Sequence, residues 1–103
     1  MAYYIVRTKP KPDRLAELNR RLGESAFLDL RPFGKALTHS LNNAKIDLDG
    51  SAIWEEEDYC SPPLAQERAV LDSYFDEIMV EPVKAGEGWA RIENLPKLGT
   101  SVS

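Results

Sequence analysis

The sequence predicts a single α+β domain in which an antiparallel sheet carries two helices on one face. Three observations support this class. They are segments rich in β-branched and aromatic residues, two segments with apolar residues at helical spacing, and an Asp-Gly turn between two strand segments. In chain order these segments give β-α-β-β-α-β and a C-terminal extension. We assign residues 1–95 to one domain and expect residues 96–103 to form a flexible tail.

The first predicted strand is Ala2–Thr8, with the sequence AYYIVRT. It is apolar at successive positions, which is typical of a central strand covered on both faces. Pro10 and Pro12 end the strand because proline cannot donate a hydrogen bond to the ladder.

A helix is predicted to begin at Asp13. Its apolar face consists of leucines at positions i, i+3 and i+7, namely Leu15, Leu18 and Leu22. Gly23 can end this helix, or the helix can continue to about Leu30.

The next predicted elements form a β-hairpin. In Lys35–Ile46, the residues Leu37, His39 and Leu41 alternate with polar residues, which favours a strand. Asp47–Gly50 has the composition of a hairpin turn, and Ser51–Tyr59 is predicted to be the returning strand.

The second helix is predicted to start with Ser61 as its N-cap and Pro62 at its first position. It should end near Asp76, and its apolar stripe comprises Leu64, Leu71 and Phe75, while Ile78 belongs either to this stripe or to the strand that follows. Glu77–Val83 follows as the last strand, and Pro82 within it favours a sheet edge. In the extension, Trp89 and Ile92 can form a short strand or an arm over the core or a partner.

Composition limits the function classes. The net charge of −4 argues against nucleic-acid binding, which requires clustered Lys and Arg. The single cysteine, Cys60, excludes an internal disulfide, and no Cys/His ligand set predicts a metal site. No signal peptide and no apolar run long enough to span a membrane is present, so we expect a cytoplasmic protein without a cofactor.

The charges are unevenly distributed along the chain. Residues 1–35 contain eight Lys and Arg against four Asp and Glu, whereas residues 36–103 contain five against thirteen. This distribution fits two differently charged surfaces of one domain, or complementary faces that meet in a homo-oligomer.

The element order over Ala2–Val83 is that of the ferredoxin-like split βαβ fold, and it resembles the dimeric α/β-barrel superfamily. The resemblance is in element order alone, without a residue motif. It implies the strand order 4-1-3-2, a homodimer, and a barrel or cleft on the open sheet face that holds a small organic molecule. RNA-recognition modules share the order, but the predicted third strand carries carboxylates, which would repel phosphate.

The most distinctive stretch is the acidic run Glu55–Asp58, between Trp54 and Tyr59. On a strand these side chains alternate, so Glu56 and Asp58 share a face with Trp54. A hairpin loop with an even number of residues would place His39 and Asn43 on that face too. An odd loop would place them on the other.

We therefore predict a candidate site on the open sheet face. Its catalytic residues would be His39 as proton acceptor with Glu56 or Asp58 as its orienting acid, and its ligand-binding residues would be Tyr4, Asn43 and Trp54. This site would make the chain a small-molecule-binding protein or a cofactor-independent enzyme. The alternative function is a non-catalytic interaction or regulatory subunit.

Overall fold

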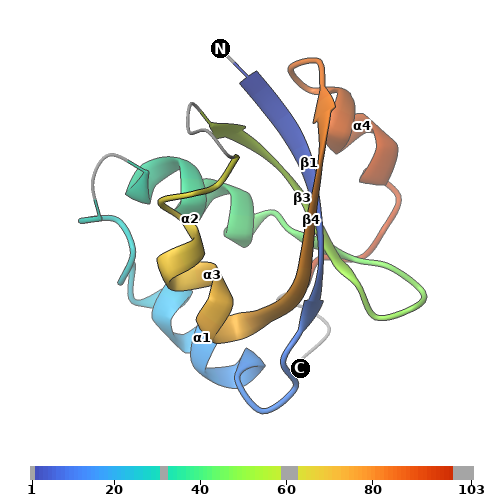
Figure 1. Cartoon of the computed structure of the whole chain (residues 1–103). Helices are drawn as coiled ribbons and strands as arrows, with labels where there is room; N and C mark the ends of the chain where they lie inside the picture. The colour runs from blue at the N-terminus through green and yellow to red at the C-terminus, as the bar shows by residue number, and fades with distance from the viewer. Residues whose placement is uncertain (1, 31–32, 59–62, 99–103) are drawn as a thin grey trace.

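A computed structural model of the chain describes residues 2–30, 33–58 and 63–98 (Figure 1). Four strands form one antiparallel sheet: β1 (Ala2–Pro10), β2 (Lys45–Ile46), β3 (Ala52–Asp58) and β4 (Phe75–Val83). The four helices are α1 (Leu15–Gly23), α2 (Gly34–Asn42), α3 (Arg68–Tyr74) and α4 (Glu87–Ile92). The α+β class and the antiparallel sheet are therefore confirmed.

The strands lie in the order β2-β3-β1-β4. The first strand is inside the sheet, as its apolar sequence predicts, and Val6 is wholly buried between Trp54 of β3 and Val80 of β4. β4 is at the edge, as Pro82 predicts, because an edge strand can lack an N–H without losing a ladder bond.

The predicted strand over Lys35–Ile46 is wrong. Most of this segment is helix α2, and only Lys45–Ile46 pairs with β3. The alternation of apolar residues hid a helical pattern, because Leu37 and Leu41 are also four residues apart. Thr38 and Ser40 are buried with them, so one face of α2 packs on the sheet. The chain therefore departs from a strict β-α-β-β-α-β order.

The hairpin loop decides which residues share a face. Lys45 pairs with Ile53 and Ile46 pairs with Ala52, so the register is centred on Asp49. The loop between the Asp47–Ser51 pair then has an odd length, and Gly50 adopts the left-handed conformation with φ +87°. The even-length loop, one of the two cases considered, is therefore wrong.

Helices α1, α2 and α3 cover one face of the sheet, and α4 lies on the other (Figure 1). We call these the helix-covered face and the open face. The core fills the helix-covered face, with Trp54 against Phe75 at 5.2 Å between ring centroids. No helix among residues 2–30, 33–58 and 63–98 has the length and apolar character needed to cross a membrane.

The second predicted helix starts later than expected, because residues 63–67 form turns and α3 begins only at Arg68, so Leu64 of the predicted stripe precedes the helix. Phe75 and Ile78 of that stripe belong to β4. Helix α3 ends at Tyr74, and β4 starts at once with Phe75. The predicted cap Ser61–Pro62 and the thiol of Cys60 lie outside the described residues.

The segment that contains Trp89 is helix α4 and not a strand. It begins after Gly86, whose φ is +83°. In the predicted tail, Leu98 is buried, and its N–H donates to the carbonyl of Ala44 at 2.8 Å. Residues 99–103 lie outside the described part of the chain.

Candidate functional site

The acids of β3 alternate between the two faces of the sheet, as strand geometry predicts. Glu55 lies on the open face, where its carboxylate accepts backbone N–H groups at the start of α4. The donors are Gly88 at 2.7 Å, Gly86 at 2.9 Å and Trp89 at 3.4 Å. Glu55 therefore fastens α4 to the sheet.

Glu56 and Glu67 form a buried carboxyl pair on the helix-covered face, each about 1% exposed. The indole N–H of Trp54 donates to Glu56 Oε1 at 2.9 Å. Burial, followed by the hydrogen bond to Glu67, raises the pKa of Glu56 to about 9. Glu56 is therefore protonated at neutral pH and can donate to Glu67.

The pKa of Glu67 is also raised, mainly by burial, and the hydrogen bond with Glu56 opposes that shift. Glu56 Oε2 and Glu67 Oε1 have no N–H or hydroxyl partner among the described residues. The hydrogen bond between the two carboxyl groups requires one proton, which lowers the cost of burying two acids together.

Asp58 and Tyr4 lie on the same face as Glu56. Asp58 is buried, and its Oδ2 accepts the backbone N–H of Leu64, which has a positive φ of +65°. Tyr4 pairs with Glu56 across the β1–β3 ladder. The structure thus gathers Tyr4, Trp54, Glu56 and Asp58, but on the face that the helices cover.

His39 and Asn43 do not join these residues. His39 is exposed on α2, and its ring meets Trp89 edge-on at 6.3 Å between centroids. It lines a cavity of about 450 Å³ with Glu55 and Glu57, the acids of the opposite face. The predicted pairing of His39 with Glu56 or Asp58 is therefore wrong, because residue 39 belongs to a helix and not to a paired strand.

Asn43 is at the end of α2, where its side-chain amide donates to the carbonyl of His39 at 2.8 Å. Trp54 is wholly buried in the core and cannot present its ring to a ligand. Two of the three predicted ligand-binding residues, Asn43 and Trp54, thus have structural partners in this fold.

A groove lies on the open face, and none of the residues that line it was among the predicted site residues. It has a volume of about 640 Å³ and lies between the sheet, the β2–β3 hairpin and the α4 region. Its apolar lining comes from strands β1, β3 and β4 and from the segment after α4, and consists of Ile5, Ile53, Met79, Val80, Ile92 and Leu95. Such a volume and lining are typical of small-molecule sites.

The charged residues of the groove form ion pairs at its rim. Arg7 Nη1 lies 3.1 Å from Asp47 Oδ2, and Arg91 Nη1 lies 3.1 Å from Glu81 Oε2. The hydrogen bond to Glu81 is the largest cause of the raised pKa of Arg91, and the hydrogen bond to Glu87 raises this pKa further. The groove therefore combines an apolar floor with two paired arginines.

A sequence signal for this groove existed in part. Ile5, Arg7 and Ile53 follow from the alternation of two correctly predicted strands. Arg91 and Ile92 could not be placed, because nothing in the sequence indicated that their segment folds back as a helix over the open face.

Among the described residues, no group of three or more His, Cys, Asp or Glu side chains is arranged to hold a metal ion. Comparison of the chain with protein-family models, curated proteins and solved structures finds no match. The functional argument therefore rests on the groove itself.

Proposed function

We propose that the protein binds a small organic molecule in the open-face groove and that a second copy covers this groove in a homodimer. The observation that carries the proposal is the groove of about 640 Å³ with an apolar floor. The strand order, which runs 4-1-3-2 from the β4 edge, supports the ferredoxin-like assignment and the expected use of the open face.

The lining indicates the class of ligand. Ile5, Ile53 and Met79 offer an apolar surface that a hydrocarbon or aromatic body would cover. Each rim arginine has five N–H donors, and its two acidic partners do not use all of them. We therefore infer a ligand with an apolar body and one anionic or strongly polar group.

The groove favours binding over catalysis. A general acid or base needs a side chain that can exchange a proton with the ligand. The acids that line this groove, Asp47 and Glu81, are both held in ion pairs with arginine. Because His39, Glu56 and Asp58 lie elsewhere, we propose a non-catalytic binding or regulatory role and not a cofactor-independent enzyme.

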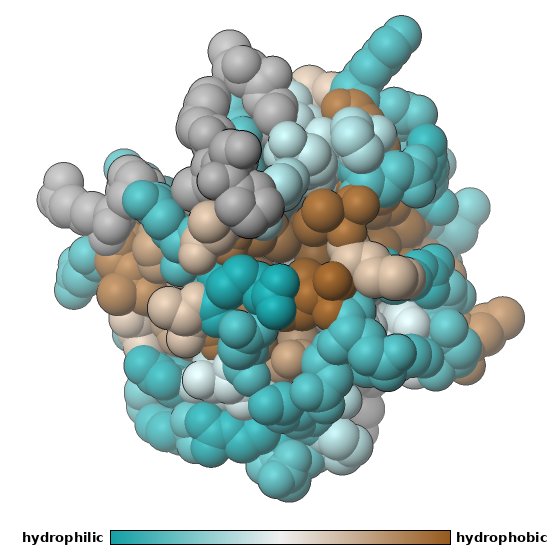
Figure 2. All heavy atoms as spheres, viewed as in Figure 1, coloured by the Kyte–Doolittle hydropathy of each residue, from teal (hydrophilic) through white to brown (hydrophobic). Residues whose placement is uncertain are grey.

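The open face suits a second copy better than the sheet edge does. Met79 on this face is 61% exposed, which is unusual for a large apolar side chain. At the edge, β4 contains Pro82 and a register shift near Glu77, whose φ is +53°. Such features discourage strand addition. Figure 2 has the viewpoint of Figure 1, in which the sheet is seen edge-on, and it shows hydrophobic residues across the middle of the molecule with hydrophilic residues around them.

The ligand site can be tested with 1-anilinonaphthalene-8-sulfonate, which has an aromatic body and one sulfonate. The dye should bind the folded wild type with an increase in fluorescence. Met79→Glu, which places a charge on the groove floor, should weaken this binding at least tenfold. Leu28→Glu is the matched control, because Leu28 is also exposed but does not line the groove.

Near-ultraviolet circular dichroism should show that both variants are folded. Equal dye affinity of wild type and Met79→Glu would rule out the groove as the binding site. The dimer is tested separately by light scattering at 10–100 μM, an order-of-magnitude range for weak association. A monomeric mass throughout would refute the second-copy part of the proposal.

A further inference from the structure

A second cavity lies at the outer edge of β3. It has a volume of about 450 Å³, which is within the range of small-molecule sites, and it shares no lining residue with the groove. Strand β2 pairs only with Ala52 and Ile53 of β3, so it leaves the rest of this edge to other elements. Helix α2 lies against that part of the edge, where the hydroxyl of Ser40 donates to the carbonyl of Glu55 at 2.8 Å.

Helix α4 separates this cavity from the groove. Trp89 lines the cavity and Arg91 lines the groove, and these two residues lie about 200° apart around the helix axis. The ring of Trp89 meets the ring of His39 edge-on at 6.3 Å between centroids, so α4 and α2 come together past the edge of β3. Glu55 holds α4 there through the backbone N–H groups of its first turn. The walls of the cavity therefore have fixed positions.

Opposite charges line the cavity on separate walls. Glu55 and Glu57 belong to β3, whereas Lys35 and His39 belong to α2 and are one turn apart, on one side of that helix. Within residues 2–30, 33–58 and 63–98, no ion pair joins Lys35 to either acid, and no hydrogen bond involves the imidazole of His39. The acidic wall and the basic wall therefore line the same space without neutralising each other.

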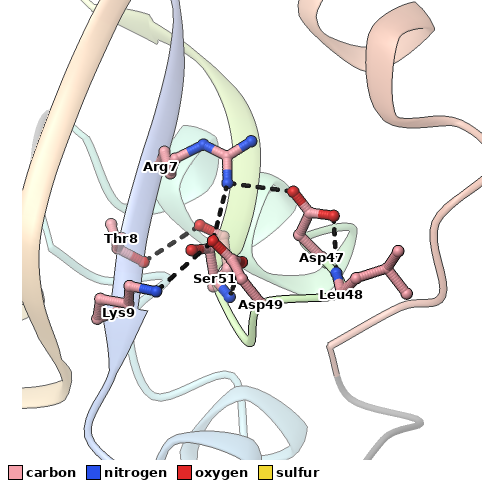
Figure 3. A network of polar contacts seen from close by, with 8 residues as sticks. Arg7, Thr8, Lys9, Asp47, Leu48, Asp49 and Ser51 are labelled. Carbon is pink, nitrogen blue, oxygen red and sulfur yellow. Dashed lines mark hydrogen bonds and ion pairs between the residues drawn. The ribbon is translucent and has the colours of Figure 1, made fainter.

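The cations of β1 beside the β2–β3 hairpin differ in this respect. Arg7 Nη1 lies 3.1 Å from Asp47 Oδ2, and Lys9 Nζ lies 3.6 Å from Asp49 Oδ2 (Figure 3). An acid of the same chain therefore partners each of these cations. Lys35 has no such partner in the part of the chain that the structure describes, so its ammonium group is available to an anionic group of a ligand.

We propose that this cavity binds a small zwitterion, namely a free amino acid with an apolar side chain. Its ammonium group binds Glu57, and its carboxylate binds Lys35 and His39. A cation without a carboxylate would be repelled by Lys35, and an anion without an ammonium group would be repelled by the acids of β3. A zwitterion gives both walls a partner of opposite charge.

The side chains of the cavity have the capacity for these contacts. A carboxylate accepts about four hydrogen bonds, so Glu57 can bind an ammonium group beside the hydroxyl of Tyr3, which donates to it at 3.0 Å. A neutral imidazole has one N–H donor, which His39 can direct to the carboxylate of the ligand. The half-buried ring of Trp89 covers the apolar side chain of the ligand.

The test titrates the isotope-labelled chain with L-phenylalanine and follows the indole N–H resonances by NMR. The resonance of Trp89 should shift, and Trp89→Phe identifies this resonance by its loss. The resonance of Trp54 should stay in place, because Trp54 is buried in the core. Phenethylamine lacks the carboxylate and hydrocinnamate lacks the ammonium group, so each should bind at least about tenfold more weakly.

Two variants test the two walls. Glu57→Gln and Lys35→Ala should each raise the dissociation constant for L-phenylalanine about tenfold, because each removes one charged partner. Lys84→Ala is the matched control and should keep the wild-type affinity, since Lys84 is also exposed but lines neither cavity. The comparison of the three ligands uses the wild type alone, so it does not depend on the folding of any variant.

The absence of any Trp89 shift at about 10 mM L-phenylalanine, which would saturate a millimolar site, would refute the proposed site. Equal binding of phenethylamine would show a site for cations, and equal binding of hydrocinnamate would show a site for anions. Either result would overturn the zwitterion as ligand.

The groove variant Met79→Glu separates this site from the proposed function. It should leave the affinity for L-phenylalanine unchanged, because Met79 lines only the groove. A loss as large as that in Glu57→Gln would place the amino acid in the groove and overturn the second site. If the dye does not bind the groove while L-phenylalanine shifts Trp89, the proposed function fails and the second site stands.

Discussion

At the residue scale, the acidic run of β3 consists of four side chains with separate roles. Glu55 binds the backbone of α4, the buried Asp58 accepts the N–H of Leu64, and the hydroxyl of Tyr3 donates to Glu57 at 3.0 Å. Glu56 differs because its partner, Glu67, is another acid. At neutral pH the folded chain holds one proton on this pair that the unfolded chain releases, so the free energy of unfolding depends on pH.

The first prediction concerns this proton. The pKa of Glu56 is about 9 in the folded state, against 4.5 for an ordinary glutamate. The folded chain therefore binds more protons than the unfolded chain between these values. The contribution of this proton to the free energy of unfolding is fully present below pH 4.5 and is lost as pH rises to about 9. The slope is at most about 1.4 kcal/mol per pH unit for one proton.

Glu56→Gln should reduce this slope by about one proton, because an amide accepts from Trp54 and donates to Glu67 without titrating. The free energy of unfolding in urea at several pH values measures the effect. Glu57→Gln removes an acid from the opposite face of the same strand and should keep the slope. The role of Glu56 would be refuted by a wild-type slope in Glu56→Gln.

At the scale of elements, α4 depends on the contact between Glu55 and Gly88. A Cβ on residue 88 would lie 2.9 Å from Glu55 Oε1 and 3.0 Å from Glu55 Cβ, which is too close. The position therefore requires glycine, even though alanine ordinarily stabilises a helix interior by about 1 kcal/mol relative to glycine.

The second prediction is that Gly88→Ala lowers the free energy of unfolding by about 1–3 kcal/mol, the usual cost of overpacking. It should also speed amide hydrogen exchange in α4. Gly23→Ala is the control, because a Cβ at the end of α1 meets no atom within 4 Å. That variant should be neutral or slightly more stable. Equal stability of Gly88→Ala and wild type would contradict the assigned role of Glu55.

The elements also show how far the sequence alone could go. The first strand and the turn at Asp47–Gly50 were predictable, because β-branched runs and Asp-Gly turns act through local geometry. Helix α2 was not, since Leu37 and Leu41 fit both a strand and a helix until the sheet selects one. Because residue 39 lies on a helix and not on a strand, His39 is not beside Glu56 and Asp58 as predicted.

The odd number of residues in the hairpin loop also changed which side chains share a face of the sheet. An odd hairpin loop turns Ile53 and Glu55 toward the side that Lys45 faces, and no local feature distinguishes it from an even one. The groove needs both this register and the return of α4 over the open face. Only its strand residues were therefore within reach of a sequence-based prediction.

At the scale of the whole molecule, the proposed dimer couples stability to protein concentration. A partner that binds only the folded chain stabilises that chain by mass action. At a free partner concentration of 100 times the dissociation constant, this stabilisation is about 2.7 kcal/mol. For a domain of this size, 1 kcal/mol shifts the melting temperature by roughly 4–8 °C.

The third prediction is that the wild-type melting temperature rises by several degrees between about 1 and 100 μM protein, a range over which weak homodimers assemble. Met79→Lys should remove this dependence, because a charge on the open face must be desolvated when a second copy docks. Leu28→Lys should keep it, since Leu28 is exposed outside the groove. Scanning calorimetry at both concentrations measures the shift. A concentration-independent wild-type transition would mean that the open face stays uncovered by a second copy, and that its apolar floor serves a ligand alone.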